Sequence, residues 1–78
     1  MNGPAVELDC RGQLCPQPVI TLARTIGRVP IGGEIVVFAD DVAAATDVPA
    51  WCRMREQEYV GAENAPDGVP GYRVRRLR

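Results

Sequence analysis

The sequence predicts an α/β fold, a two-layer sandwich in which two helices cover one face of a mixed four-stranded sheet in the order βαβαββ. The first observation is an amphipathic helical stripe, with apolar residues at i, i+3, i+4 and i+7: Val19, Leu22, Ala23 and Ile26. The second is the unbroken apolar run of residues 35–39, which is typical of a central strand beside a parallel neighbour. The third is a pair of closing strands around a turn-rich loop at 65–71. With 78 residues, 46% of them hydrophobic, we expect residues 1–78 to form one domain.

The remaining elements follow from local signals. Residues 6–10 alternate apolar and polar side chains, which predicts the first strand, and residues 58–63 and 72–77 predict the last two. The second helix is predicted with Asp47 as its N-cap and Pro49 in its first turn, although the alanines at 43–45 also permit an earlier start. Four residues form its expected inward stripe, the arginine by its apolar stem: Val48, Trp51, Cys52 and Arg55.

The composition excludes several kinds of chemistry. The chain has no His, Ser or Lys, which removes Ser-His and Cys-His pairs, Schiff bases and histidine-containing zinc sites. Its three cysteines form no C-x-x-C, so we expect neither a disulfide scaffold nor a metal site, and no cofactor. Without an 18-residue apolar stretch or a signal sequence, the chain is expected to be cytoplasmic, with no membrane partner.

The charge is unevenly distributed. Four arginines at positions 73, 75, 76 and 78 give the last seven residues a charge of +4. The preceding 71 residues carry −5, so the net charge of the chain is −1. We interpret this as a solvated terminal strand with a charged edge; a weak contact with an acidic partner or RNA is the alternative. Direct nucleic-acid binding is not favoured, since only 5% of residues are aromatic. The run at 35–39 also places apolar side chains on the outer sheet face, either as an exposed stripe or as a docking or self-association surface.

Cys15 is the candidate for chemistry, because it precedes Pro16-Gln17-Pro18 at the start of a helix. We predict that Cys15 is the N-cap, exposed at least in part, with Pro16 at N1 and the amides of Gln17 and Val19 nearest its sulfur. The positive helix end, with Arg11 nearby, would then lower the pKa of the thiol. No histidine is present to act as a base, so thiol exchange suits this site better than hydrolysis. An ordinary small residue at a helix start is the alternative.

Residues 8–19, LDCRGQLCPQPV, resemble the L-D-x-R-G-x-x-C-P-x-P-[VI] signature of the TusA (SirA-like) sulfur-carrier family. A second block is similar as well: Gly33-Glu34, Asp40-Asp41 and the segment DVPAWC at 47–52. The resemblance implies a sulfurtransferase that carries sulfur on Cys15 as a persulfide, supported by the motif residues Arg11, Gly12, Pro16 and Pro18. Gln17, Ile20 and Asp41 are the expected partner-docking residues.

The resemblance also implies partners. Sulfur donors in the family include cysteine desulfurases and rhodanese-like proteins, and acceptors serve tRNA thiolation, cofactor sulfuration or sulfur metabolism. This chain departs from the family in having only Arg24 as a basic residue of the first helix after the motif, and Glu56-Gln57 where a histidine often stands. These departures concern the partner and the pathway. A non-catalytic regulatory or interaction domain of a sulfur-related transporter or enzyme is the alternative function, and an RNA-contacting accessory factor is a weaker one.

The other two thiols are expected in the core. Cys52 lies on the inward stripe of the second helix, where a free cysteine behaves as a small apolar residue. Cys10 shares the strand parity of Val6 and Leu8, which directs it toward the helices. A resolving thiol that pairs with Cys15 is the alternative for Cys10.

Overall fold

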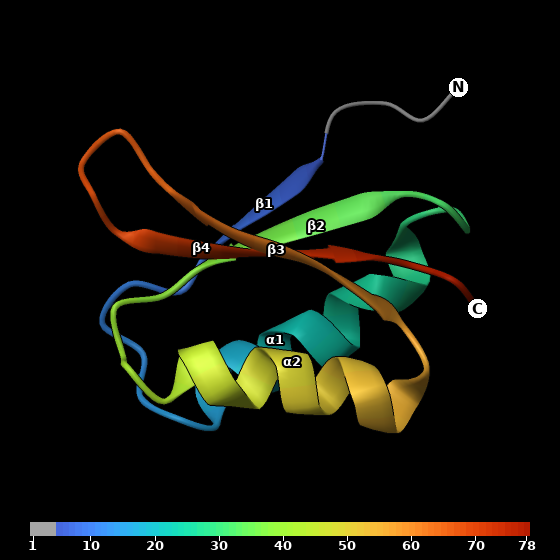
Figure 1. The fold of residues 1–78 in the computed structure, drawn as a ribbon, viewed down its shortest axis with the longest axis horizontal. Helices are drawn as coiled ribbons and strands as arrows, with labels where there is room; N and C mark the ends of the chain where they lie inside the picture. Colours follow the sequence, from blue (N-terminus) through green and yellow to red (C-terminus); the bar gives the residue numbers. More distant parts are fainter. Residues whose placement is uncertain (1–4) are drawn as a thin grey trace.

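The computed structural model describes residues 5–78 and has the predicted βαβαββ order, with the sheet in one layer and both helices in the other (Figure 1). The strands are β1 (Val6–Asp9), β2 (Glu34–Phe38), β3 (Glu58–Asn64) and β4 (Pro70–Arg75). The helices are α1 (Gln17–Thr25), continued by a 3₁₀ turn at Ile26–Arg28, and α2 (Ala44–Arg55). Within residues 5–78, no helix is long and apolar enough to cross a bilayer.

The sheet order is β1-β2-β4-β3. β1 and β2 are parallel, since α1 carries the chain across between them, whereas β4 is antiparallel to both β2 and β3. The arginine-rich strand is therefore an inner strand, and the prediction of a charged terminal edge is wrong. The hairpin formed by β3 and β4 returns β4 to the free side of β2, which leaves β1 and β3 as the edges.

The main core lies between the sheet and the helices. β2 and β4 contribute Ile35, Val37 and Val74, each with no exposed surface. The helices contribute fully or nearly fully buried side chains at Pro18, Leu22, Ala44, Val48, Trp51 and Cys52. Burying a side chain of valine or leucine size contributes roughly 1.5–3 kcal/mol, so this layer contact is the main source of stability.

Two predicted stripe residues do not face the core. Ala23 is exposed, because Pro18 and Leu22, four residues apart, set the buried line of α1, and Ala23 lies one position further round the helix. Arg55 is exposed in the last turn of α2, where its charged group retains its hydration. Ala44 instead completes the buried stripe of α2 at its first turn.

The outer sheet face has its own small core, so the prediction of an exposed apolar stripe is wrong. Val36 is 1% exposed and Phe38 8%, and they pack with Ala65 and Val69 of the loop between β3 and β4. The guanidinium of Arg11 lies 5.6 Å from the centre of the Phe38 ring. The loop between β3 and β4, which the sequence predicts only as a turn, therefore folds back over β2.

Ion pairs cover the rest of this face. Arg73, opposite Val36 in the strand register, pairs with Glu63 at 2.7 Å and Glu34 at 2.9 Å. Arg75 pairs with Glu34 at 2.7 Å and with Glu58 at 2.9 Å. The result is a ladder of alternating charge across three strands. The last two arginines are also engaged within the chain, since Arg76 donates to the carbonyl of Val29 and Arg78 pairs with Glu56.

Candidate functional site

Cys15 lies in the turn before α1, one residue further from the helix than predicted. Pro16 is the N-cap, Gln17 the first helical residue and Pro18 the second, and the Cys15–Pro16 peptide bond is cis. The turn closes through the amide of Gln17, which donates to the carbonyl of Leu14 at 2.8 Å. Because this amide already has a partner, it is not the free donor that the sequence predicted beside the sulfur.

Two carboxylates after β2 anchor the loop that carries Cys15. Asp40 accepts the amide of Gly12, with oxygens at 3.0 and 3.2 Å, and Gly12 has the left-handed backbone that glycine favours (φ 78°). Asp41 accepts the amides of Cys15 at 2.7 Å and of Ala43 at 3.0 Å. These two bonds lower the pKa of the Asp41 carboxyl. The two carboxylates therefore connect the loop that carries Cys15 to the end of β2 and to the start of α2.

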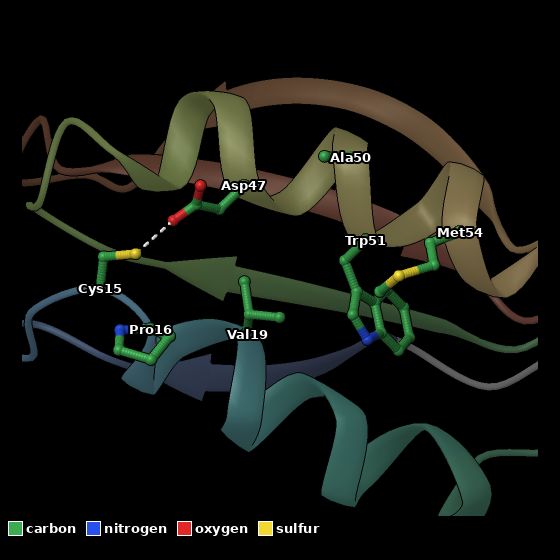
Figure 2. Close-up of a pocket in the computed structure, with 7 residues that line it drawn as sticks. All are labelled: Cys15, Pro16, Val19, Asp47, Ala50, Trp51 and Met54. Atoms are coloured by element: carbon green, nitrogen blue, oxygen red, sulfur yellow. Dashed lines mark hydrogen bonds between the residues drawn. The ribbon is translucent and has the colours of Figure 1, made fainter.

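The second helix begins at Ala44, with Ala43 as its N-cap and no side-chain cap. Asp47 is therefore inside the first turn, and its prediction as the N-cap is wrong, whereas the earlier start that the alanines permit is confirmed. The cause is Asp41, whose bond to the amide of Ala43 makes an Asx turn three residues before the helix. This shift turns the Asp47 side chain toward Cys15 (Figure 2).

The Cys15 sulfur is exposed, and its thiol donates to Oδ2 of Asp47, with 2.6 Å between Sγ and Oδ2. The hydrogen bond to Asp47 raises the pKa of the thiol, and a small loss of hydration and the negative charges of Asp47 and Asp41 act in the same direction. The predicted lowering of this pKa is therefore wrong: two carboxylates oppose the weak field of the helix end.

Arg11 does not offset these charges. Its guanidinium pairs with Asp9 at 2.9 Å and with Asp67 at 3.2 Å, next to the Phe38 ring. It is absent from the groups that shift the pKa of Cys15. The expectation that Arg11 favours a thiolate at Cys15 is therefore wrong. The contacts of Arg11 instead connect the loop before α1 to the loop after β3.

An open groove of about 290 Å³ runs from Cys15 between the two helices (Figure 2). Cys15, Pro16 and Val19 line one side; Asp47, Ala50, Trp51 and Met54 line the other. Met54, at the end of the groove away from Cys15, is 72% exposed, whereas Trp51 is only 5% exposed. The walls are mostly apolar, so the groove has room for an apolar side chain beside the sulfur.

Three of the predicted site residues do not line the groove. Pro18 is buried in the core and does not frame the sulfur directly. Gln17 is exposed and Ile20 is half-buried on α1, and neither lines the groove. Sequence reasoning missed Asp47, Ala50 and Met54 as lining residues. Their positions at i, i+3 and i+7 on one helix are the signal that could have found them.

The other two cysteines are separate from this site. Cys10 is 0% exposed and Cys52 is 1% exposed, and both are free thiols in the main core, which confirms the predicted packing role. Burial raises the pKa of the Cys10 thiol, and it raises that of Cys52 to about 11. Within residues 5–78, no three side chains of His, Cys, Asp or Glu come together as a metal site.

Comparisons with known proteins identify the family and the fold. The family described as Sulfurtransferase TusA matches residues 6–76. Among solved structures, a SirA-like protein from Desulfitobacterium hafniense superposes with a TM-score of 0.79 over 94% of this chain and 99% of its own. The two sequences are 19% identical, so this likeness shows the shared fold.

Proposed function

Because this chain belongs to the TusA sulfurtransferase family, we propose that it is a sulfur carrier, which accepts persulfide sulfur on Cys15 and relays it to a partner protein. The single observation that carries the proposal is the contrast among its thiols. Cys15 is exposed at the head of a groove, whereas Cys10 and Cys52 are buried in the core. Only an exposed sulfur can meet the persulfide of another protein.

The transfer needs no oxidant and no cofactor. Cys15 Sγ attacks the outer sulfur of a donor persulfide, and a new sulfur–sulfur bond forms on Cys15 while the donor's own sulfur–sulfur bond breaks. The donor leaves as a thiolate and takes up the proton that Cys15 releases. In the second step an acceptor thiolate attacks the outer sulfur on Cys15, which returns to a thiol. Sulfur moves between thiols without net oxidation.

The partners that fit this chemistry are a donor such as a cysteine desulfurase or a rhodanese-like protein, and an acceptor sulfur-relay protein. The pathway would be tRNA thiolation, cofactor sulfuration or sulfur metabolism, in the cytoplasm, with residues 1–78 acting as one domain. Gln17, which is exposed, and Ile20, which is half-buried, would contribute to the surface that docks such partners. Asp41, whose carboxylate accepts the Cys15 amide, would contribute to partner docking from the loop after β2.

Mass spectrometry after incubation with a sulfur donor tests the proposal. The protein should gain about 32 Da per sulfur, on the peptide containing Cys15. Cys15→Ser should not load and should keep its unfolding temperature, because the exposed side chain changes by one atom. Loading on Cys10 or Cys52 in place of Cys15 would contradict the assignment.

A non-catalytic interaction domain is the second candidate. Two observations favour it: the raised pKa of Cys15 disfavours the reactive thiolate, and the exposed Met54 extends the groove beyond the sulfur. Under this alternative, wild-type protein stays unloaded with donors that load an exposed control thiol, and a partner binds wild type and Cys15→Ser equally.

A further inference from the structure

The side chain of Asp47 has no part in capping α2 and faces the Cys15 sulfur across the head of the groove. It is half-buried, projects from the first turn of α2, and lies 2.6 Å from Sγ through Oδ2 (Figure 2). Among residues 5–78, no arginine forms an ion pair with Asp47. Its charge is therefore directed at the thiol.

We propose that Asp47 is a positioning residue for sulfur transfer, which holds empty Cys15 as a protonated thiol at the groove and disfavours the charged, loaded form. This inference rests on the proposed sulfur-carrier function. It gives the carboxylate opposite effects on the two states of the carrier. Asp47 stabilises the empty state by accepting a hydrogen bond and destabilises the loaded state by charge repulsion.

The charged groups around the sulfur all act in the same direction. Asp47 faces it from α2, and Asp41 holds the Cys15 amide from the loop after β2. α1 has no acidic residue in its first turn, and its only basic residue, Arg24, lies in the last turn. Arg11, on the motif loop, is paired with Asp9 and Asp67. The raised pKa of Cys15 is consistent with this surplus of negative charge.

The consequence for sulfur follows from the acidity of the two forms. A persulfide is a stronger acid than the parent thiol, so near neutral pH loaded Cys15 carries a negative charge while empty Cys15 does not. Exchange with glutathione persulfide balances as Cys15–SH plus glutathione–S–S⁻ giving Cys15–S–S⁻ plus glutathione–SH. Asp47 opposes the right-hand side of this exchange. The carrier should therefore give up its sulfur more readily than a carrier without this carboxylate.

The first test measures the thiol itself. The alkylation rate of Cys15 by iodoacetamide is followed from pH 6 to pH 10 by peptide mass spectrometry, which separates Cys15 from the buried thiols. Asp47→Asn removes the charge at nearly constant size. It should react about two- to fivefold faster at pH 7, the effect expected of one surface charge pair, and its profile should move to lower pH.

Two variants serve as matched controls. Glu7→Gln removes one negative charge from the outer sheet face, on β1, and should react like wild type. Asp47→Glu retains the charge and should stay closer to wild type than Asp47→Asn does. An Asp47→Asn profile that superimposes on wild type, or that moves to higher pH, would overturn the inference.

The second test measures the loaded state. Each protein is equilibrated with glutathione persulfide and glutathione, and the loaded fraction on Cys15 is read by intact mass. The loaded-to-empty ratio should be about two- to fivefold higher for Asp47→Asn than for wild type. Equal ratios would overturn the inference and leave the carrier function standing. If wild type takes up no sulfur from any donor, the carrier function fails, and with it the persulfide half of the inference; the alkylation profile then decides whether Asp47 holds the thiol.

Discussion

Serine in place of Cys52 should destabilise the fold by about 1–3 kcal/mol and leave sulfur loading on Cys15 intact. Cys52 is 1% exposed and packs in the main core with Val48 and Trp51. Its thiol is a weak donor that tolerates an apolar site, whereas a hydroxyl there loses its hydration. The nearest acceptor for serine within the helix is the carbonyl of Val48, one turn earlier, and a bond to it would bring the loss to the low end of that range.

The size of the effect makes it easy to measure. For a chain of this length, each kcal/mol lowers the unfolding temperature by about 4–8 °C. Urea unfolding can be followed by the fluorescence of Trp51, the only tryptophan, which is buried beside Cys52. Cys52→Ala is the matched control, because it removes the sulfur without burying a hydroxyl, and it should cost less than Cys52→Ser. Unchanged stability together with lost sulfur loading would refute the argument and give Cys52 a role in the chemistry.

Two further predictions concern Cys10 and the charge ladder. Cys10→Ala should load Cys15 to within about twofold of wild type, because a buried thiol of raised pKa is inert; a Cys10–Cys15 disulfide under mild oxidant, with slower sulfur release in the variant, would show a resolving thiol instead. Hydrogen bonds from Arg75 and Arg73 lower the pKa of Glu34, so the stability from this carboxylate is present above its ordinary pKa of 4.5 and is lost as the pH falls below that value. Glu34→Gln should lose less stability than wild type over that range in urea titrations, and parallel losses would contradict the ladder's contribution.

The order and type of the four strands and the two α-helices could be predicted from the sequence, because each has a strong local signal, whereas the 3₁₀ turn at Ile26–Arg28 was not predicted. The run at 35–39 becomes β2 with a shift of one residue, and the stripe containing Leu22 becomes α1. The core positions of Cys10 and Cys52 also follow from periodicity, since a side chain's direction depends on its place within its own element. The resemblance of the C-P-x-P segment to a known family agrees with the family match over residues 6–76.

The helix boundaries and the edge strands of the sheet were harder to predict from the sequence. The start of α2 depends on Asp41, which lies outside the helix and binds the amide of Ala43. Asp47 has the residue type of an N-cap as well, so local preference alone did not choose between the two starts. The inner position of β4 depends on which side of β2 the final hairpin takes, and strand composition does not determine this.

By itself the sequence determined the fold class, the buried and exposed thiols, and the choice of Cys15 as the sulfur-bearing candidate. Only the tertiary structure decided the environment of that sulfur. Asp47 is 32 residues from Cys15 in the chain, and the two meet because α1 and α2 pack side by side on one face of the sheet. The sequence shows only the field at the end of the helix that follows Cys15, whereas the pKa of the thiol depends on every charge within a few ångströms. The sign of the shift at Cys15 was therefore set by the packing of the two helices and could not be obtained from either helix alone.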